Sequence, residues 1–160
     1  MKIREAIIDD HDGIWEIFSR VIESGDTFAY SPKTSKEEFE KLWFGPNMKT
    51  FVFIHSNKVQ GLYWIRANQP GLGSHIANAA YIVHPDSRGI GIGDKLCKHS
   101  LETAAINGFK AMQYNIVVST NNVAVSLWQR NGFQIIGTIP NGFRHLKLGY
   151  VDAFIMYREL

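Results

Sequence analysis

The stretch of sequence that decides the fold is Ile82-Val83-His84-Pro85-Asp86-Ser87-Arg88-Gly89-Ile90-Gly91-Ile92-Gly93. An apolar run from Ala77 to Val83 leads into it, and apolar residues at helical spacing follow from Ile92 to Ala105. The pattern predicts a strand, a glycine-rich turn and a helix in direct succession. Glycines let backbone N–H groups come close to a ligand, and a helix N-terminus carries partial positive charge. With Arg88 as a permanent cation, the turn is expected to bind an anion, which we interpret as a pyrophosphate.

The spacing of the glycines excludes two common pyrophosphate-binding motifs. A P-loop closes with Gly-Lys-Ser/Thr, but Asp94 stands where that second glycine would fall after Gly89. A dinucleotide-binding turn would need its third glycine at position 94 or 96, where the chain has Asp94 and Leu96. The alternative is an ordinary glycine-rich turn between a strand and a helix. What remains as a motif is Arg-x-x-Gly-x-Gly, formed by Arg88, Gly91 and Gly93.

Composition limits the class of protein. The chain has 160 residues, of which 45% are hydrophobic and 20% are charged, so we expect one domain spanning residues 1–160. A net charge of +2 argues against nucleic acid as a partner, and no apolar run is long enough to cross a membrane. The single cysteine, Cys97, and six histidines without ligand spacing predict that no metal is bound. A cytoplasmic protein fits these features.

Hydrophobic periodicity predicts the order of the elements. Alternating runs indicate strands, and apolar residues spaced by three or four indicate helices. Strands are expected at residues 2–8, 50–55, 59–67, 75–83, 112–118, 133–139 and 151–158, and helices from Asp9 or Asp10 to 22 and at 35–44, 91–107 and 121–131. The strands on either side of the long third helix should be parallel, with a right-handed crossover. The fold class is therefore α+β, with a mixed, mostly antiparallel sheet around a central parallel pair.

A second motif follows the glycine turn. Residues 121–133 read Asn-x-x-Ala-x-x-Leu-Trp-x-x-x-Gly-Phe. Together the two motifs resemble those of the GNAT (GCN5-related) N-acetyltransferases. The resemblance implies a GNAT fold with a splayed central strand pair flanked by helices, and an enzyme in which an amine attacks acetyl-CoA directly, without a metal. It also implies that coenzyme A contacts Ile82, Val83, Arg88, Gly89, Ile90, Gly91, Ile92, Gly93, Asp94, Asn121, Ala124 and Trp128.

A narrower resemblance is to fungal N-acetyltransferases that act on azetidine-2-carboxylate and related proline analogues. It rests on Asn78 in its strand and on Tyr114-Asn115-Ile116-Val117, Thr120-Asn121, Leu127-Trp128 and Tyr150-Val151-Asp152-Ala153. It implies a small-molecule amine as acceptor, such as an amino acid or a proline analogue. Two alternatives remain open: a coenzyme A-binding regulatory or degenerate member with little catalysis, and an enzyme that acetylates proteins or peptides. Whether the chain is a monomer or a homodimer is also left open.

The catalytic groups that the resemblance implies are partly missing. Trp128 stands where the family has a tyrosine that protonates the departing thiolate, and an indole N–H cannot supply that proton. Asn78 and Ala80 occupy strand positions where a carboxylate base is often found. We therefore expect Asn78 and Asn115 to be the catalytic side chains, holding the substrate or ordering a water. An apolar strand accepts an asparagine only if its amide finds partners, and the alternative is that each bonds to neighbouring backbone.

The acceptor pocket is expected beside an aromatic loop. Phe28 and Tyr30 lie in a segment broken by glycine and proline, where they either line a substrate pocket or pack onto the core. Tyr81 is expected to be part of the core or a wall of the acyl pocket. We expect less reactive roles for the other residues that carry chemistry: a surface position for His84, a structural hydrogen bond for Asp152 and a buried, unreactive thiol for Cys97.

Overall fold

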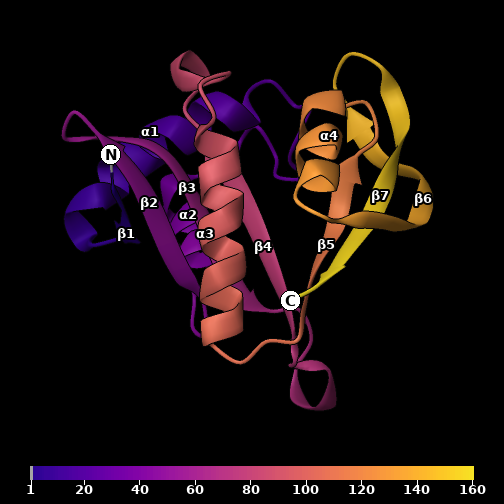
Figure 1. Cartoon of the computed structure of the whole chain (residues 1–160). Coiled ribbons are helices and arrows are strands. Elements are labelled where there is room, and N and C mark those ends of the chain that lie inside the picture. The colour runs from indigo at the N-terminus through magenta and orange to yellow at the C-terminus, as the bar shows by residue number, and fades with distance from the viewer. Residues whose placement is uncertain (1) are drawn as a thin grey trace.

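The computed structural model of the protein describes residues 2–160 and has the helices and strands in the predicted order (Figure 1). The strands are β1 (Lys2–Glu5), β2 (Lys49–His55), β3 (Lys58–Ala67), β4 (Ile76–Val83), β5 (Ala111–Val118), β6 (Gln134–His145) and β7 (Gly149–Glu159). The helices are α1 (His11–Ile22), α2 (Lys36–Trp43), α3 (Ile92–Ile106) and α4 (Asn122–Arg130), with short 3-10 turns at Ile8–Asp10, Gly71–Gly73 and Pro85–Ser87. Within the described residues, no helix is both long and apolar enough to cross a membrane.

The strands form a seven-stranded sheet in the order β1-β2-β3-β4-β5-β7-β6. Neighbouring strands are antiparallel except β4 and β5, which are parallel as predicted. The parallel pairing joins Ile76 to Ala111 and Ala77 to Met112, and beyond these residues the two strands diverge, as Figure 1 shows. The divergence leaves the edge of β4 over residues 78–83 without a neighbouring strand on that side, which creates room for a ligand.

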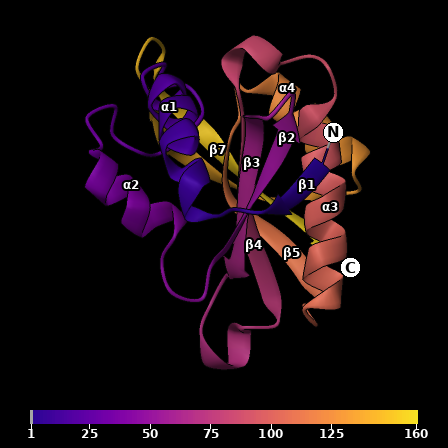
Figure 2. The ribbon, with the colours of Figure 1, turned by 90° about the vertical axis from the view of Figure 1, so that its left-hand side faces the viewer.

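Helices cover both faces of strands β2 to β4 (Figure 2). Helices α1 and α2 lie on one face, where Leu62 and Trp64 of β3 are buried. Helix α3 lies on the other face, where Tyr63 and Ile65 of the same strand are buried. Alternate residues of β3 thus enter different cores, so that both faces of the strand gain from the burial of apolar surface.

Specific caps fix the ends of the helices. The Ser35 hydroxyl accepts the N–H of Glu38 at 3.2 Å, and the Glu38 carboxylate accepts the N–H of Ser35 at 2.8 Å, which is a capping box at the predicted start of α2. Asn121 accepts the N–H of Ala124 at 3.2 Å and caps α4. The asparagine and alanine of the second motif therefore have a structural role at the start of this helix.

The first predicted strand is too long at its C-terminal end. Strand β1 stops at Glu5 rather than residue 8, because the Asp10 carboxylate bends the chain back by accepting the Ile7 N–H at 2.8 Å. The same carboxylate binds the Arg4 guanidinium at 2.6 and 2.9 Å. Asp10 does stand at the N-cap position of α1, but its side chain makes no capping hydrogen bond to that helix.

The last hairpin is longer than predicted. Strand β6 continues past Ile139 to His145, and β7 begins at Gly149 rather than Val151. A bulge between Ile139 and Phe143 absorbs the Pro-Asn-Gly segment that resembles a turn in the sequence. The N–H of Asn141 in this bulge donates to the Asp152 carboxylate at 2.9 Å, which is the structural hydrogen bond expected for Asp152.

Candidate active site

A cleft of about 980 Å³ lies where β4 and β5 diverge. Residues 78–83 of β4 and 114–118 of β5 form two of its walls. The glycine turn and the start of α4 border one end, and residues 26–30 of the loop between α1 and α2 border the other. The cleft therefore connects the predicted anion-binding turn to the predicted acceptor loop.

The predicted anion-binding end of the cleft depends on the backbone conformation of two glycines. Gly89 has φ +80° and Gly91 has φ +83°, and within residues 2–160 no atom other than those of the glycine and its chain neighbours lies within 4 Å of where either would carry a Cβ. Glycine is thus needed for its backbone angle rather than for space. Gly91 caps α3, so the N–H groups of Ile92, Gly93 and Asp94 have no acceptor within the helix and remain available to an anion.

Gly93 and Asp94 fasten α3 to α4. A Cβ on Gly93 would lie 3.0 Å from Leu127 Cδ2, so the glycine permits a close approach of the two helices. The Asp94 carboxylate accepts the Asn131 amide at 3.0 Å and pairs with Lys98 at 2.7 Å, and these bonds, to Lys98 first, lower its pKa. Asp94 lines the cleft, but its carboxylate is held by protein groups, which leaves its backbone N–H as the group that could meet a phosphate.

Arg88 and Ile90 are exposed on the turn. Arg88 lines the cleft and makes no ion pair or side-chain hydrogen bond within the described part of the chain. A guanidinium without a protein partner keeps all its donors for a ligand. Ile90 is 66% exposed and is not among the residues that line the cleft.

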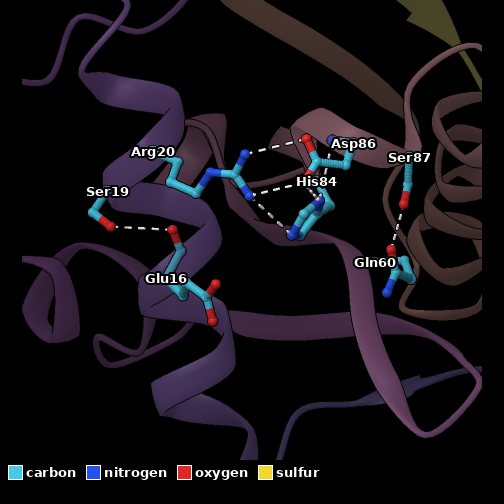
Figure 3. Close-up of polar contacts among 7 residues, drawn as sticks. All are labelled: Glu16, Ser19, Arg20, Gln60, His84, Asp86 and Ser87. Carbon is cyan, nitrogen blue, oxygen red and sulfur yellow. Dashed lines mark hydrogen bonds and ion pairs between the residues drawn. The ribbon is translucent and has the colours of Figure 1, made fainter.

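A cluster of polar side chains anchors the 3-10 turn that leads into the glycine turn (Figure 3). Arg20 of α1 binds both carboxylate oxygens of Asp86, at 3.1 and 3.2 Å, and lowers the pKa of that carboxyl. His84 caps the 3-10 turn by accepting the Asp86 N–H at 3.2 Å, and its other ring nitrogen lies 3.4 Å from Arg20. His84 was expected at the surface, yet its side chain is only 17% exposed, and Arg20 of α1 lies against its ring. Ser87 donates to the side chain of Gln60 in β3.

A buried network of hydroxyl groups stands behind one wall of the cleft. Ser100 donates to the Cys97 carbonyl at 2.6 Å, so it accepts from Tyr81, whose oxygen lies 2.6 Å away. Tyr81 in turn accepts from Tyr114 at 2.8 Å. Burial raises the pKa of both phenols well above their usual value near 10. Tyr81 is both core and cleft wall, and its proton is already used within the network.

Trp128 covers this network. Its ring centroid lies 4.8 Å from that of Tyr81 and 5.0 Å from that of Tyr114, and the residue is 8% exposed. Beneath it Cys97 is buried, and burial raises the pKa of its thiol to about 12. The expected buried position of Cys97 is confirmed, and a raised thiol pKa disfavours the reactive thiolate.

The two asparagines that border the cleft differ in whether their side-chain amides already have hydrogen-bond partners. Asn78 is half-buried on β4, and no side-chain hydrogen bond joins its amide to another described residue. Asn115 is exposed at a bulge in β5, where it donates to Asn68 at 2.7 Å and accepts from Gln113 at 3.0 Å. Neither amide bonds to neighbouring backbone, which was the alternative expected for them. Asn78 is available to a ligand, whereas Asn115 is held in place by other side chains.

Phe28 and Tyr30 of the aromatic loop pack onto the core and also border the cleft. The rings of Phe28 and Tyr30 stack at 5.7 Å, and Tyr30 also packs against Phe18 of α1 at 5.4 Å. Both residues line the cleft as well. Burial raises the pKa of Tyr30, and the nearby N–H of Trp64 works against this rise.

Sequence reasoning missed three parts of this end of the cleft. Thr27 and the pair Trp64 and Arg66 of β3 line it. The tip of the β6–β7 hairpin also reaches it: Leu146 donates its N–H to the Gly25 carbonyl at 3.1 Å. The signal available in the sequence was a pair of leucines, Leu146 and Leu148, in a short polar turn.

Metal-binding groups do not form part of this arrangement. Within residues 2–160, no three side chains of His, Cys, Asp or Glu lie close enough together to hold a metal ion. The cleft therefore offers a glycine turn with unpaired backbone N–H groups, a free strand edge, two amides and an aromatic end.

The chain matches the Acetyltransferase (GNAT) family over residues 12–133, which include both motifs. The protein belongs to this family. It is similar to N-acetyltransferase aca1 of Schizosaccharomyces pombe, with 33% identity over 152 residues that cover 84% of this chain and 72% of that protein. This GNAT chain is accordingly an acetyl-CoA-dependent acyltransferase, in agreement with the prediction.

Solved structures agree with the fold. A GCN5-related N-acetyltransferase from Kribbella flavida superposes with a TM-score of 0.94 at 39% identity, over 99% of this chain and 97% of that one. A phosphinothricin acetyltransferase from Sinorhizobium meliloti, solved with acetyl-CoA, gives a TM-score of 0.87 at 21% identity, over 99% and 88% of the two chains. The predicted GNAT fold, with its mixed sheet and splayed parallel pair, is confirmed.

Proposed function

We propose that this GNAT acetyltransferase transfers the acetyl group of acetyl-CoA to a small-molecule amine, such as an amino acid or a proline analogue. The observation that carries the proposal is the contact between the tip of the β6–β7 hairpin and the acceptor loop at one end of the cleft. The hydrogen bond from Leu146 to the Gly25 carbonyl holds the hairpin tip against the loop that carries Phe28 and Tyr30. A bounded aromatic pocket suits a small acceptor, whereas a polypeptide needs an open groove.

The anion-binding end fits coenzyme A. In this proposal the N–H groups of Ile92, Gly93 and Asp94 bind the diphosphate, and the unpaired Arg88 adds charge. The free edge of β4 at Ile82 and Val83 binds the pantetheine arm through backbone hydrogen bonds. Gly89 and Gly91 shape the turn, and Ile90 packs against the exposed part of the cofactor. Asn121 and Ala124 act through the cap that places α4, and therefore Trp128, beside the thioester.

The reaction follows from these positions. The neutral amine attacks the thioester carbon, a C–N bond forms, the C–S bond breaks, the amine loses a proton to solvent and the thiolate gains one. Asn78, with its free amide, binds the reacting amine or the water beside it, and Asn115 fixes the acceptor from the opposite strand. The cleft wall also carries His145, whose Nδ1 accepts the N–H groups of Lys147 and Leu148 at 3.1 and 3.3 Å. That nitrogen cannot serve as a base while the hairpin tip is folded.

Release of thiol from acetyl-CoA tests the proposal. A panel of amino acids, azetidine-2-carboxylate, polyamines and short peptides should give turnover with one of the small amines. Calorimetric titration with coenzyme A provides the companion measurement. Binding of coenzyme A without thiol release from any acceptor would instead identify a non-catalytic member, for which the absence of a tyrosine at Trp128 is the favouring observation. Turnover confined to peptides would overturn the small-molecule assignment.

A further inference from the structure

We propose that Arg66 binds a carboxylate of the acceptor, so that the enzyme selects amines that also carry an acid group. The inference rests on the proposed function, because it assigns the acceptor end of the same cleft. It begins from the register of two strands. Arg66 of β3 is paired with Asn78 of β4, and partners in an antiparallel pair project from the same face of the sheet. The guanidinium and the free amide therefore border the cleft side by side.

The Arg66 guanidinium is oriented but not neutralised. Its central carbon lies 5.0 Å from the centroid of the Trp64 ring, a cation–π contact. No carboxylate of the described residues pairs with it. Asp26, which lines the same end of the cleft, instead accepts a hydrogen bond from Ser24. Contact with an aromatic face leaves the N–H groups at the rim of the guanidinium free for a planar, bidentate anion.

Three buried polar side chains of the described residues lack a hydrogen-bond partner, and two of them, Thr27 and Trp64, line the cleft together with Arg66. The indole N–H groups of Trp43 and Trp64 and the hydroxyl of Thr27 are buried without a hydrogen-bond partner in residues 2–160. The Tyr30 oxygen lies near both indole N–H groups. These groups work to lower the pKa of Tyr30, although neither contact has the geometry of a hydrogen bond. A buried donor without a partner is unfavourable, and a carboxylate brings acceptor sites on both of its oxygens.

The position of the basic residues makes this role specific to Arg66. Arg130 contributes to the low pKa of Asp94, so it lies with Arg88 at the diphosphate end. Arg66 is the guanidinium of the cleft wall that borders the acceptor loop. The charge needed for the cofactor and the charge needed for the acceptor are thus supplied by different side chains.

The experiment compares each of a panel of amino acids, azetidine-2-carboxylate among them, with its own carboxamide, which keeps the amine and removes the negative charge. Calorimetry on the protein saturated with coenzyme A measures binding without turnover, and thiol release measures kcat/KM. The wild-type protein should prefer the acid to its amide. Arg66→Gln should weaken binding of the acid by about 10- to 100-fold and that of the amide by less than about 3-fold. Trp64→Phe keeps the ring under Arg66 and should weaken acid binding by a smaller factor.

Arg144→Gln is the matched control, because Arg144 is an exposed arginine of β6 that does not line the cleft. Arg144→Gln should change neither the ratio of acid to amide binding affinity nor the ratio of their kcat/KM values. Equal loss for acid and amide in Arg66→Gln, no wild-type preference, or no binding of either compound would overturn the assignment of Arg66. Preference for acids in binding together with no thiol release would support Arg66 and reject the proposed catalysis. Turnover of the acids and their amides with equal kcat/KM would support the proposed catalysis and reject the assignment of Arg66.

Discussion

The Arg20 guanidinium holds both oxygens of the Asp86 carboxylate, at 3.1 and 3.2 Å, and so joins α1 to the turn that leads into α3 (Figure 3). Residues far apart in the sequence thereby fix the start of the backbone that is proposed to bind the diphosphate. The pair is exposed, so its contribution to stability should be small. The proposed role of the pair is to position the backbone N–H groups of the turn, because a misplaced N–H group binds a phosphate poorly even when the fold is intact.

Arg20→Met should therefore raise the KM for acetyl-CoA by about 3- to 10-fold while leaving the melting temperature nearly unchanged. Lys41→Met provides the control, since it breaks the similarly exposed ion pair with Glu37 on α2, away from the turn. Steady-state kinetics and thermal melts on both variants give the comparison. Equal KM values in the two variants would show that the Arg20 contact does not position the turn.

Gly91→Ala should impair binding of coenzyme A through the backbone. Gly91 has φ +83°, a conformation that costs a residue with a Cβ about 1–2 kcal/mol, so the turn should shift to relieve the strain. Gly108→Ala is a matched control at the other end of α3, because Gly108 has φ +84° and also has open space around its Cβ position. Both variants should lose similar stability in urea unfolding, whereas titration should show weaker coenzyme A binding in Gly91→Ala alone. Similar affinity in both would place the diphosphate elsewhere.

Asn78→Ala should lower kcat by about 100-fold or more, because the amide that meets the reacting group is removed. Stability should change little, since Asn78 loses no side-chain partner within the described residues. Asn115→Ala should have a similar effect on kcat. Asn68→Ala removes the acceptor that holds the Asn115 amide and should give a smaller loss, which tests whether Asn115 must be fixed in place. A folded Asn78→Ala protein with wild-type kinetics would exclude this residue from the site.

The sequence was sufficient to predict the fold, and it also allowed a cofactor end to be proposed, because the signals for both are local. The glycine turn, the asparagine cap of α4 and the apolar periodicity each depend on residues close together in the chain. The acceptor end was harder. In the sequence, Arg66 looks like an ordinary polar residue near the end of a strand. Only its pairing with Asn78 in the sheet indicates the role proposed for it. The contact of Leu146 with Gly25 joins distant segments in the same way. The extent of β6 was missed because a bulge, rather than a turn, takes up its Pro-Asn-Gly segment.

Asp10 should make the stability of the fold depend on pH. Its hydrogen bonds to Arg4, followed by that from the Ile7 N–H, lower its pKa in the folded state against the opposing effect of burial. The stabilisation is therefore complete above the unfolded-state value near 3.8 and is lost as the pH falls through the folded-state pKa. Asp10→Asn should lower the free energy of unfolding by about 1–3 kcal/mol at pH 7. Urea unfolding at pH 7 and at pH 3 should show the difference between the two proteins shrinking at the lower pH; a constant difference would contradict this account.

Cys97 should remain unmodified in the folded protein, because the thiolate is the reactive form and burial raises the pKa of this thiol to about 12. Treatment with N-ethylmaleimide at pH 8 should leave both the mass and the thiol-release activity unchanged, and labelling should appear only in denaturant. Cys97→Ser should also retain activity, which separates direct attack by the amine from a route through an acetylated cysteine. An acetylated Cys97 peptide recovered after incubation with acetyl-CoA alone would establish the covalent route instead.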